Sequence, residues 1–372
     1  MKRKKPNYKQ SILNIAGSLM HRYGVDSDLS GIKELDEEFK YSYKHVVVIL
    51  LDGLGSNVLK QHLTPMDAFR VYTRKEITSV FPPTTVAATN AFLSGMPPIS
   101  NGWIGWVQYF PNEDVNNVVF LNQDYYNEDR SIPAGLSEKY ISYESIFQKI
   151  KSRNPSLDVF ELYPSFRLDG FASFEAQVEK IKSIVRESKE SLTYCYWIEP
   201  DLTEHMYGIS SDKTKEMVES LNRTFETLIQ EMIEDTIVVV FADHGLVDVE
   251  EIYFPDYSDL TDCLIRLPSI EPRAVNFFVK SGKKREFKKR FNVHFKGKFI
   301  LFSKRRFKHL LGEGKEHAMI DRFLGDFIGV AIDKYTLRST KGIPFQGHHA
   351  GLTTDEMMIP LVIHTKRKKE RP

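Results

Sequence analysis

Apolar residues occur along this chain in short continuous runs, separated by segments of helical periodicity. The most prominent runs are residues 45–51, 192–198 and 236–242. A short run that is rich in β-branched or aromatic residues is typical of a strand that a parallel sheet buries on both faces. We therefore expect strands of a mostly parallel sheet at these positions.

Helical periodicity predicts the elements that cover this sheet. Apolar residues recur every three or four positions in residues 8–22, 174–188 and 212–233, and the last segment is the most regular. Because it lies between the runs at 192–198 and 236–242, it completes a strand–helix–strand unit of the length that a parallel crossover requires. The predicted class is α/β.

Two parts of the chain depart from this pattern. Residues 247–341 contain short alternating strands and a basic run from Lys283 to Lys308, and we expect a small α+β insertion there. The basic run is typical of a solvated face; alternatively, it lies over a site and binds substrate phosphates. Residues 109–139 are polar and aromatic with several turn signals, which predicts a surface excursion.

Acidic side chains follow each of the three predicted strands. Asp52 comes after the first, Asp201 after the second, and Asp243 with His244 after the third. In open α/β sheets ligands bind beyond the carboxyl ends of the strands, so these side chains mark the expected site. His205 lies four residues after Asp201, on one side of a helical turn, where a carboxylate and an imidazole can hold one divalent ion.

Two further segments supply candidate groups. Residues 81–95 begin with Phe-Pro-Pro and continue as a predicted helix that starts at Thr84 or Thr85. A helix start offers free N–H groups to a phosphate, and a hydroxyl there could attack it; a plain capping threonine is the alternative. Towards the end of the chain, His348 and His349 lie in a turn flanked by glycines, which permit close approach to a bound group.

Composition narrows the class of protein. The 372 residues are 41% hydrophobic and 27% charged, and the formal net charge of +1 gives no global field for nucleic acid or an anionic membrane. The two cysteines, Cys195 and Cys263, form no Cys-x-x-Cys motif, which argues against a thiolate zinc site or a disulfide framework. No apolar run has the length of a membrane span and no signal-type segment follows the basic N-terminus, so we expect a cytoplasmic protein.

The candidate side chains together predict a two-metal chemistry. Three carboxylates and three imidazoles are too many for one catalytic ion that keeps an open position, but they suit two ions, most simply Zn²⁺, with Mn²⁺ or iron as alternatives. Paired ions clamp the attacking and leaving oxygens of an in-line displacement. A threonine hydroxyl that loses its proton to metal coordination is a competent nucleophile. The implied substrate is a small phosphoester.

The order of these motifs resembles the alkaline phosphatase superfamily, and within it the nucleotide pyrophosphatase/phosphodiesterase branch. The motifs are Asp-Gly at 52, Phe-Pro-x-x-Thr at 81, Glu-Pro-Asp-x-x-x-His at 199, Ala-Asp-His-Gly at 242 and Gly-x-His-x-Gly at 347. The resemblance implies a three-layer α/β sandwich around a mostly parallel sheet. It also implies hydrolysis of phosphodiester or pyrophosphate bonds, with nucleotides among the candidate substrates, through a covalent phospho-threonine intermediate.

The resemblance assigns roles to the matching residues. Thr85 rather than Thr84 is the nucleophile, because it is the fifth residue of the Phe-Pro-x-x-Thr motif. His349 rather than His348 is a ligand, because the family's histidine precedes a small residue and a glycine. One ion would be held by Asp201, His205 and His349, and the other by Asp52, Asp243 and His244, with Thr85 bridging toward it.

The sequence departs from the family in two places. The family's Pro-x-x-His-Gly is here Pro98-Ile-Ser-Asn101-Gly102, and an asparagine that donates to a phosphate oxygen corresponds, counted without gaps, to Trp106. The phosphate contact could instead come from Asn90, Asn101 or a backbone N–H. The candidate substrate-binding residues are therefore Asn90, Asn101 and Trp106, and a phosphomonoesterase or phosphonate hydrolase remains an alternative. A non-catalytic binding module is the alternative from a different class.

The chain is expected to divide into an alkaline phosphatase-like core, residues 1–246 and 342–372, and an inserted cap subdomain, residues 247–341. The expected partner is a small-molecule phosphoester. No stable nucleic-acid partner and no membrane partner are expected, and the oligomeric state is left open.

Overall fold

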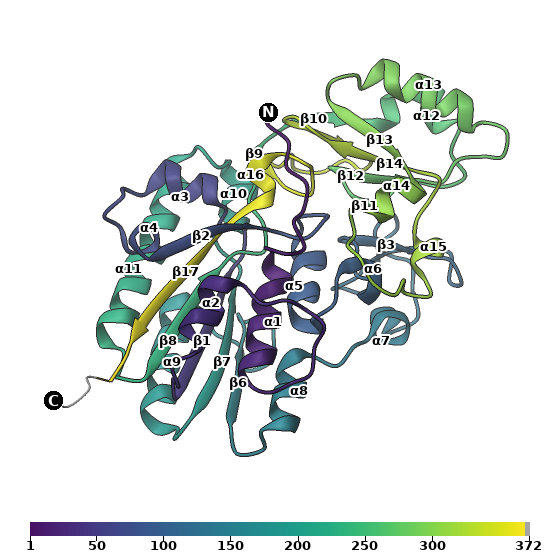
Figure 1. Cartoon of the computed structure of the whole chain (residues 1–372). Coiled ribbons are helices and arrows are strands. Elements are labelled where there is room, and N and C mark those ends of the chain that lie inside the picture. The colour runs from purple at the N-terminus through teal and green to yellow at the C-terminus, as the bar shows by residue number, and fades with distance from the viewer. Residues whose placement is uncertain (369–372) are drawn as a thin grey trace.

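The computed structural model describes residues 1–368 and contains a six-stranded main sheet with the order β2-β17-β8-β1-β7-β6 (Figure 1). One strand, β17, runs antiparallel to its two neighbours, and the other strand pairs of this sheet are parallel. The predicted mostly parallel sheet is thus confirmed. Its strands are β1 (His45–Leu51), β2 (Thr73–Thr78), β6 (Asp158–Leu162), β7 (Ser191–Trp197), β8 (Thr236–Phe241) and β17 (Met358–Lys366).

Helices cover both faces of the main sheet, so that all residues of β1 and β8 are buried. This explains why their sequences are continuous apolar runs rather than alternating ones. One face carries α1 (Ile12–Arg22), α2 (Lys33–Glu38), α5 (Thr85–Ser94) and α8 (Ile146–Arg153). The other carries α3 (Ser56–His62), α4 (Ala68–Tyr72), α9 (Phe174–Glu187) and α11 (Asp212–Glu231). The three-layer α/β prediction is confirmed.

A second sheet lies beside the main one and is antiparallel, with the order β13-β14-β12-β11-β3-β4-β5. Four of its strands come from the predicted insertion: β11 (Ser269–Glu271), β12 (Ala274–Phe277), β13 (Phe299–Ser303) and β14 (Phe327–Ala331). The other three are β3 (Val107–Phe110), β4 (Val115–Val118) and β5 (Gln123–Asp124).

The expectation that residues 109–139 form a surface excursion was wrong for β3, β4 and β5. These strands are short and mostly buried, and β3 pairs with β11 far along the chain. The second sheet therefore takes strands from two separate stretches of sequence. The division into a core and an inserted cap stays a prediction, and the last residues of that predicted core, 369–372, lie outside the described ones.

Besides a 3₁₀ helix at Phe254–Asp256, the described chain contains further short helices and strands. They are α6 (Pro98–Asn101), α7 (Leu136–Ile141), α10 (Asp201–Tyr207), α12 (Ser258–Thr261), α13 (Lys284–His294), α14 (Lys304–Lys308), α15 (Ile320–Phe323), α16 (Thr354–Met357), β9 (Val247–Asp248), β10 (Glu250–Tyr253), β15 (Tyr335–Arg338) and β16 (Gly347–His348). Within residues 1–368, no helix combines the length and the apolar character that crossing a membrane requires.

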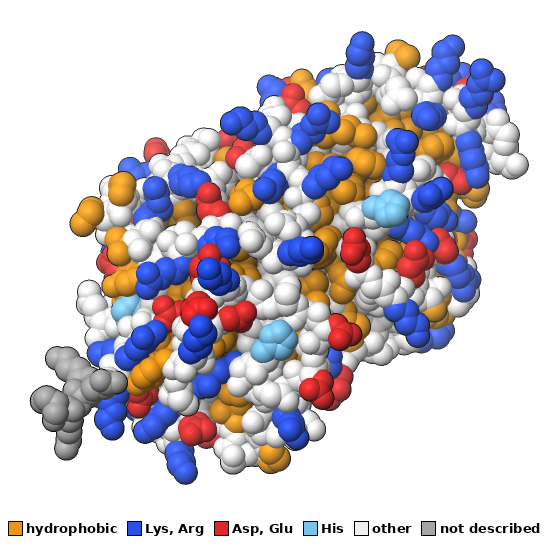
Figure 2. Space-filling view, in the orientation of Figure 1, with side chains coloured by type: hydrophobic (Ala, Val, Ile, Leu, Met, Phe, Trp, Pro, Cys, Tyr) orange, Lys and Arg blue, Asp and Glu red, His pale blue; other side chains and the backbone are white. Residues whose placement is uncertain are grey.

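The basic run of the insertion forms α13 and the segments around it. Phe287 and Phe291 bury one side of α13 against the second sheet, and its lysines and arginines face outward. In Figure 2 blue side chains are dense at this end of the molecule, away from α10 and α16. The basic run is therefore a solvated face and does not lie over the carboxyl edge of the main sheet.

A fully buried ion pair joins the two sheets. Arg273, in the turn between β11 and β12, donates two hydrogen bonds of 2.7 and 2.9 Å to the carboxylate of Glu356 in α16. The same carboxylate accepts the N–H of Gly351, and the backbone carbonyl of Glu356 accepts the N–H of Gly245. The pair thus connects the second sheet to both loops that carry candidate histidines.

We predict that Glu356→Gln strongly destabilises the fold. The substitution leaves the buried guanidinium of Arg273 without a charged partner, and removing one member of a buried pair costs about 3–5 kcal/mol. Equilibrium urea unfolding should show a clear loss in the free energy of unfolding. Glu37→Gln, which removes an exposed pair with Lys40, is the control and should leave it almost unchanged. Equal stability of the two variants would contradict the role given to Arg273 and Glu356.

Candidate active site

Three parallel strands end together at one edge of the main sheet. β1 pairs in register with β7 on one side and with β8 on the other. Asp52 directly follows β1, Asp243 follows β8, and Asp201 begins α10 after β7. The N–H of Asp201 also donates to the carbonyl of Asp52 at 3.1 Å. The sheet register therefore brings the three carboxylates together, as the sequence predicts.

Glycines permit the close packing of these loops. Gly53 has a positive φ of 74°, and a Cβ there would lie 2.8 Å from the Cα of Asp201. A Cβ on Gly245 would lie 2.3 Å from the carbonyl oxygen of Asp355. No other residue fits at either position without displacing backbone, so the Asp-Gly and His-Gly pairs follow from the geometry of the site.

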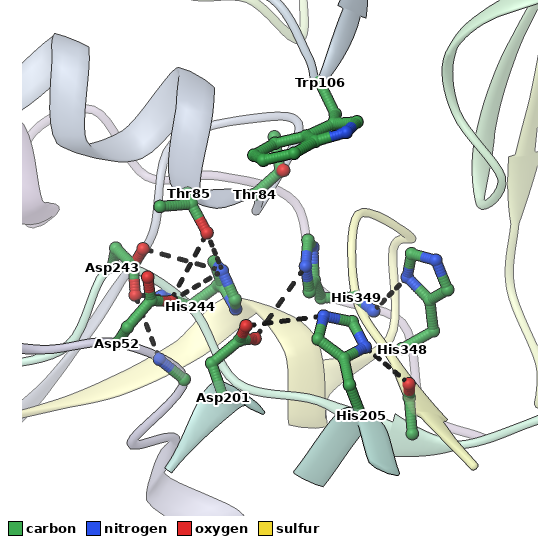
Figure 3. Close-up of polar contacts among 12 residues, drawn as sticks. Asp52, Thr84, Thr85, Trp106, Asp201, His205, Asp243, His244, His348 and His349 are labelled. Atoms are coloured by element: carbon green, nitrogen blue, oxygen red, sulfur yellow. Dashed lines mark hydrogen bonds and ion pairs between the residues drawn. The ribbon is translucent and has the colours of Figure 1, made fainter. Parts of the chain in front are cut away.

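The first acid–histidine group consists of Asp201, His205 and His349, whose ligand atoms lie within 4.8 Å of one another (Figure 3). Nδ1 of His205 lies 2.8 Å from the carbonyl oxygen of Gly347, which leaves Nε2 facing Asp201 Oδ2 at 3.4 Å. His348 is not a member of this group. Its Nδ1 accepts the backbone N–H of His349 at 2.9 Å.

The second acid–histidine group consists of Asp52, Asp243 and His244, all buried and likewise within 4.8 Å. Oδ1 of Asp243 accepts the N–H groups of Gly53 and His244, so Oδ2 is the oxygen that remains, 3.5 Å from His244 Nε2. Oδ1 of Asp52 lies 3.4 Å from the same Nε2. Backbone N–H groups thus orient Asp243 and leave its second oxygen free of hydrogen bonds.

Burial opposes the charge of these acids and lowers the basicity of the histidines. It raises the pKa of Asp52 and Asp201 well above the usual range, and raises that of Asp243 to about 7. It lowers the pKa of His205 to about 4 and that of His244 to about 3. The imidazoles are therefore held neutral, which is the form that binds a metal.

The two groups fit divalent cations. Asp201 Oδ1 and Asp243 Oδ2 are buried and have no hydrogen-bond partner among the described residues. An unpartnered buried carboxylate oxygen is energetically costly, and a cation would remove that cost. Carboxylate and neutral imidazole are a donor set that Zn²⁺, Mn²⁺ or iron can use.

The two candidate threonines point to different neighbours. Thr85, the first residue of α5, places Oγ1 3.3 Å from Asp52 Oδ1 and 3.2 Å from His244 Nε2. The hydroxyl of Thr84 instead donates to Glu271 at 2.7 Å. Of this adjacent pair, only Thr85 contacts the second acid–histidine group.

The three candidate substrate-binding residues also differ in position. Asn90 donates to the carbonyl of Val86, and Asn101 donates to the carbonyl of Met96. Both amides are buried and used in hydrogen bonds within the protein, and Asn90 also accepts the hydroxyl of Tyr143. Trp106 is 37% exposed and lies above the start of α5, facing the two acid–histidine groups (Figure 3).

Sequence reasoning missed two residues that contact the site. The hydroxyl of Tyr196, on β7, donates to Oδ2 of Asp52. The alternation of Tyr194 and Tyr196 along a strand that leads to Asp201 was a signal that could have indicated it. Glu271 bonds Thr84 from the second sheet, and burial raises its pKa to about 7. No local pattern distinguishes Glu271 from any other acid of the insertion.

Comparison with known sequences identifies the family. A sequence model of the type I phosphodiesterase / nucleotide pyrophosphatase family matches residues 46–351. The chain belongs to this family. The predicted resemblance is thereby confirmed, and membership indicates a phosphoester hydrolase that depends on metal. No curated protein matches the chain in sequence.

Comparison with solved structures supports the fold. An inactive variant of murine ectonucleotide pyrophosphatase/phosphodiesterase 5 in complex with AMP has a TM-score of 0.64 at 19% identity, covering 87% of this chain and 89% of that one. Phosphonoacetate hydrolase from Sinorhizobium meliloti 1021 in complex with phosphonoformate has a TM-score of 0.62 at 15% identity, covering 89% and 92%. At these identities the likeness shows a shared fold.

We predict that Asp201→Asn lowers the bound metal by one ion per chain. The amide lacks the charge that compensates a divalent cation, and loss of even an outer-shell partner weakens metal binding by about 10–100-fold. Elemental analysis after dialysis measures the change. His348→Asn is the matched control, because the asparagine oxygen can still accept the N–H of His349. Undiminished metal in Asp201→Asn would argue against the first acid–histidine group as a metal site.

Proposed function

We propose that this chain hydrolyses phosphodiester or pyrophosphate bonds of small molecules, nucleotides included, with Thr85 as the nucleophile. The observation that carries the proposal is the position of the Thr85 hydroxyl, 3.3 Å from a carboxylate oxygen and 3.2 Å from an imidazole nitrogen of the second acid–histidine group. The start of α5 adds free N–H groups and the positive end of the helix dipole, which suit a phosphoryl group.

Two divalent ions, most simply Zn²⁺, would be held by the two acid–histidine groups and would supply charge compensation and a lowered pKa for the attacking hydroxyl. The protein's own contribution is orientation. Asp243 is fixed by backbone N–H groups, Asp52 by Tyr196, and His205 by the carbonyl of Gly347. Side chains held in this way do not rotate away from the site when substrate binds.

The proposed reaction has two steps on Thr85. In the first, Oγ attacks phosphorus, the bond to the leaving oxygen breaks, and the alcohol or phosphate departs as a phospho-threonine forms. In the second, water attacks the same phosphorus, which releases the phosphate product and returns the hydroxyl to Thr85. The structure of a relative with AMP bound supports a nucleotide among the substrates.

The charges around the site favour diesters over monoesters. Among residues 1–368, no lysine or arginine forms an ion pair with the acids of the two groups, whose ion-pair partners are all histidines. A phosphodiester carries one negative charge, whereas a phosphomonoester carries close to two at neutral pH. Because no lysine or arginine is paired with these acids, we expect the second charge to be compensated less well and the diester to be preferred.

We predict that Thr85→Ala lowers turnover by more than about a thousandfold, because it removes the group that forms the covalent intermediate. Steady-state hydrolysis of bis-p-nitrophenyl phosphate measures the loss, and metal analysis should show near-normal content. Thr84→Ala should keep easily measurable turnover. If Thr85→Ala remains active and Thr84→Ala does not, the nucleophile is misassigned.

We predict that bis-p-nitrophenyl phosphate is hydrolysed with a higher kcat/KM than p-nitrophenyl phosphate by the metal-loaded chain. The two substrates share a leaving group, so the ratio of their kcat/KM values depends on the charge of the phosphoryl group and on the second ester. A ratio below one would favour the phosphomonoesterase alternative. A chain that binds metal but hydrolyses neither ester would favour the binding module.

A further inference from the structure

Glu271 connects the second sheet to the start of α5. It is the last residue of β11, is buried, and accepts two hydrogen bonds of 2.7 Å on one oxygen. One comes from the hydroxyl of Thr84 and the other from the backbone N–H of Trp106. A single carboxylate oxygen therefore fixes both the residue before Thr85 and the loop that faces it.

The backbone that presents Glu271 is strained. Ile270 has a φ of 77°, a conformation that a β-branched residue rarely adopts. Its side chain packs against Gly105, where a Cβ would lie 2.7 Å from Ile270 Cγ2. Such strain persists only where the surroundings impose it, and it is commonest at functional sites.

Trp106 is held firmly but is only partly covered. Its N–H bonds Glu271, its carbonyl accepts the N–H of Val119 at 3.1 Å, and the ring of Phe120 meets its indole edge-on at 5.8 Å. The indole nevertheless stays 37% exposed and lies across the site from the carboxylates (Figure 3). Within the described chain, no aromatic ring stacks face to face on this indole.

We propose that the open face of Trp106 is a binding subsite for a flat aromatic group of the phosphoester, and that Glu271 positions it. The inference rests on the proposed function and names the group that the substrate carries. That group is a nucleobase or a small aryl ester, which share the flat apolar surface that an indole recognises. The backbone N–H of Trp106 is already bonded to Glu271, so what the residue presents to a ligand is its indole ring.

The affinities of product-like ligands distinguish contacts at the subsite from contacts at the phosphoryl site. Calorimetry on the metal-loaded chain compares AMP with ribose 5-phosphate, and phenyl phosphate with methyl phosphate. Within each pair the ligands share a phosphate monoester, and only the first member carries an aromatic ring. The wild-type chain should bind the aromatic member of at least one pair more tightly.

Trp106→Ala should weaken that aromatic ligand by about 5–150-fold, the range of base–aromatic stacking, and leave its partner unchanged. Trp106→Phe keeps a flat ring and should retain most of the preference. A loss for AMP alone identifies a nucleobase, and a loss for phenyl phosphate identifies an aryl ester. An equal change for both members of each pair, or no change for either aromatic ligand, would overturn the subsite.

Two variants test the positioning role of Glu271. Glu271→Gln keeps an oxygen that can accept both hydrogen bonds and should preserve the aromatic preference. Glu271→Ala should lose it as Trp106→Ala does, with unchanged metal content. An unaltered preference in Glu271→Ala would overturn the positioning role. These binding measurements do not depend on turnover. If the chain hydrolyses no ester, the proposed function is contradicted, and the subsite is still tested by binding.

Discussion

Negative charge buried at one edge of the main sheet is the constraint on which this structure depends. The register of three parallel strands places Asp52, Asp201 and Asp243 side by side, with no lysine or arginine among residues 1–368 paired to them. Burial raises the pKa of each acid, so the carboxylates are either protonated or compensated by cations. The surrounding imidazoles are neutral at physiological pH and are oriented as ligands. Of the two possibilities, compensation of the carboxylates by cations is therefore favoured over their protonation.

A metal centre works only if its ligands are held within a fraction of an ångström. Here the contacts that hold the candidate ligands come from residues outside the site. His349 lies in a loop that could move freely if it were attached only to β16. The buried pair of Arg273 and Glu356 ties that loop to the second sheet, and the carbonyl of Glu356 ties it to Gly245 beside His244. The two acid–histidine groups therefore share one rigid support, and the second sheet is part of that support.

The sequence predicted the main sheet and the acids and histidines that the structure brings together, because both follow from local patterns. A buried strand is a continuous apolar run, and Asp52 and Asp243 follow such runs directly, while Asp201 follows one after two residues. The sequence did not predict the strands at 107–124, because β3 joins the second sheet by pairing with β11 far along the chain and the pattern of these residues is polar and aromatic. The role of Glu271 was not predicted either, because its two hydrogen bonds join residues that are 187 and 165 positions apart in sequence. The spacing of the family motif selected Thr85 over Thr84, and in the structure Thr85 faces Asp52 while Thr84 bonds Glu271.

The departure at Trp106 changes what the site can recognise. The side-chain amides of Asn90 and Asn101 donate to local carbonyls, so no side-chain amide of the predicted set replaces the family's asparagine. In the proposed function the phosphoryl oxygens then rely on the backbone N–H groups at the start of α5 and on the bound ions. These donors contact the phosphoryl group and do not distinguish one ester group from another. Discrimination between substrates must therefore come from the ester group, and the exposed indole held by Glu271 is the aromatic surface that faces it.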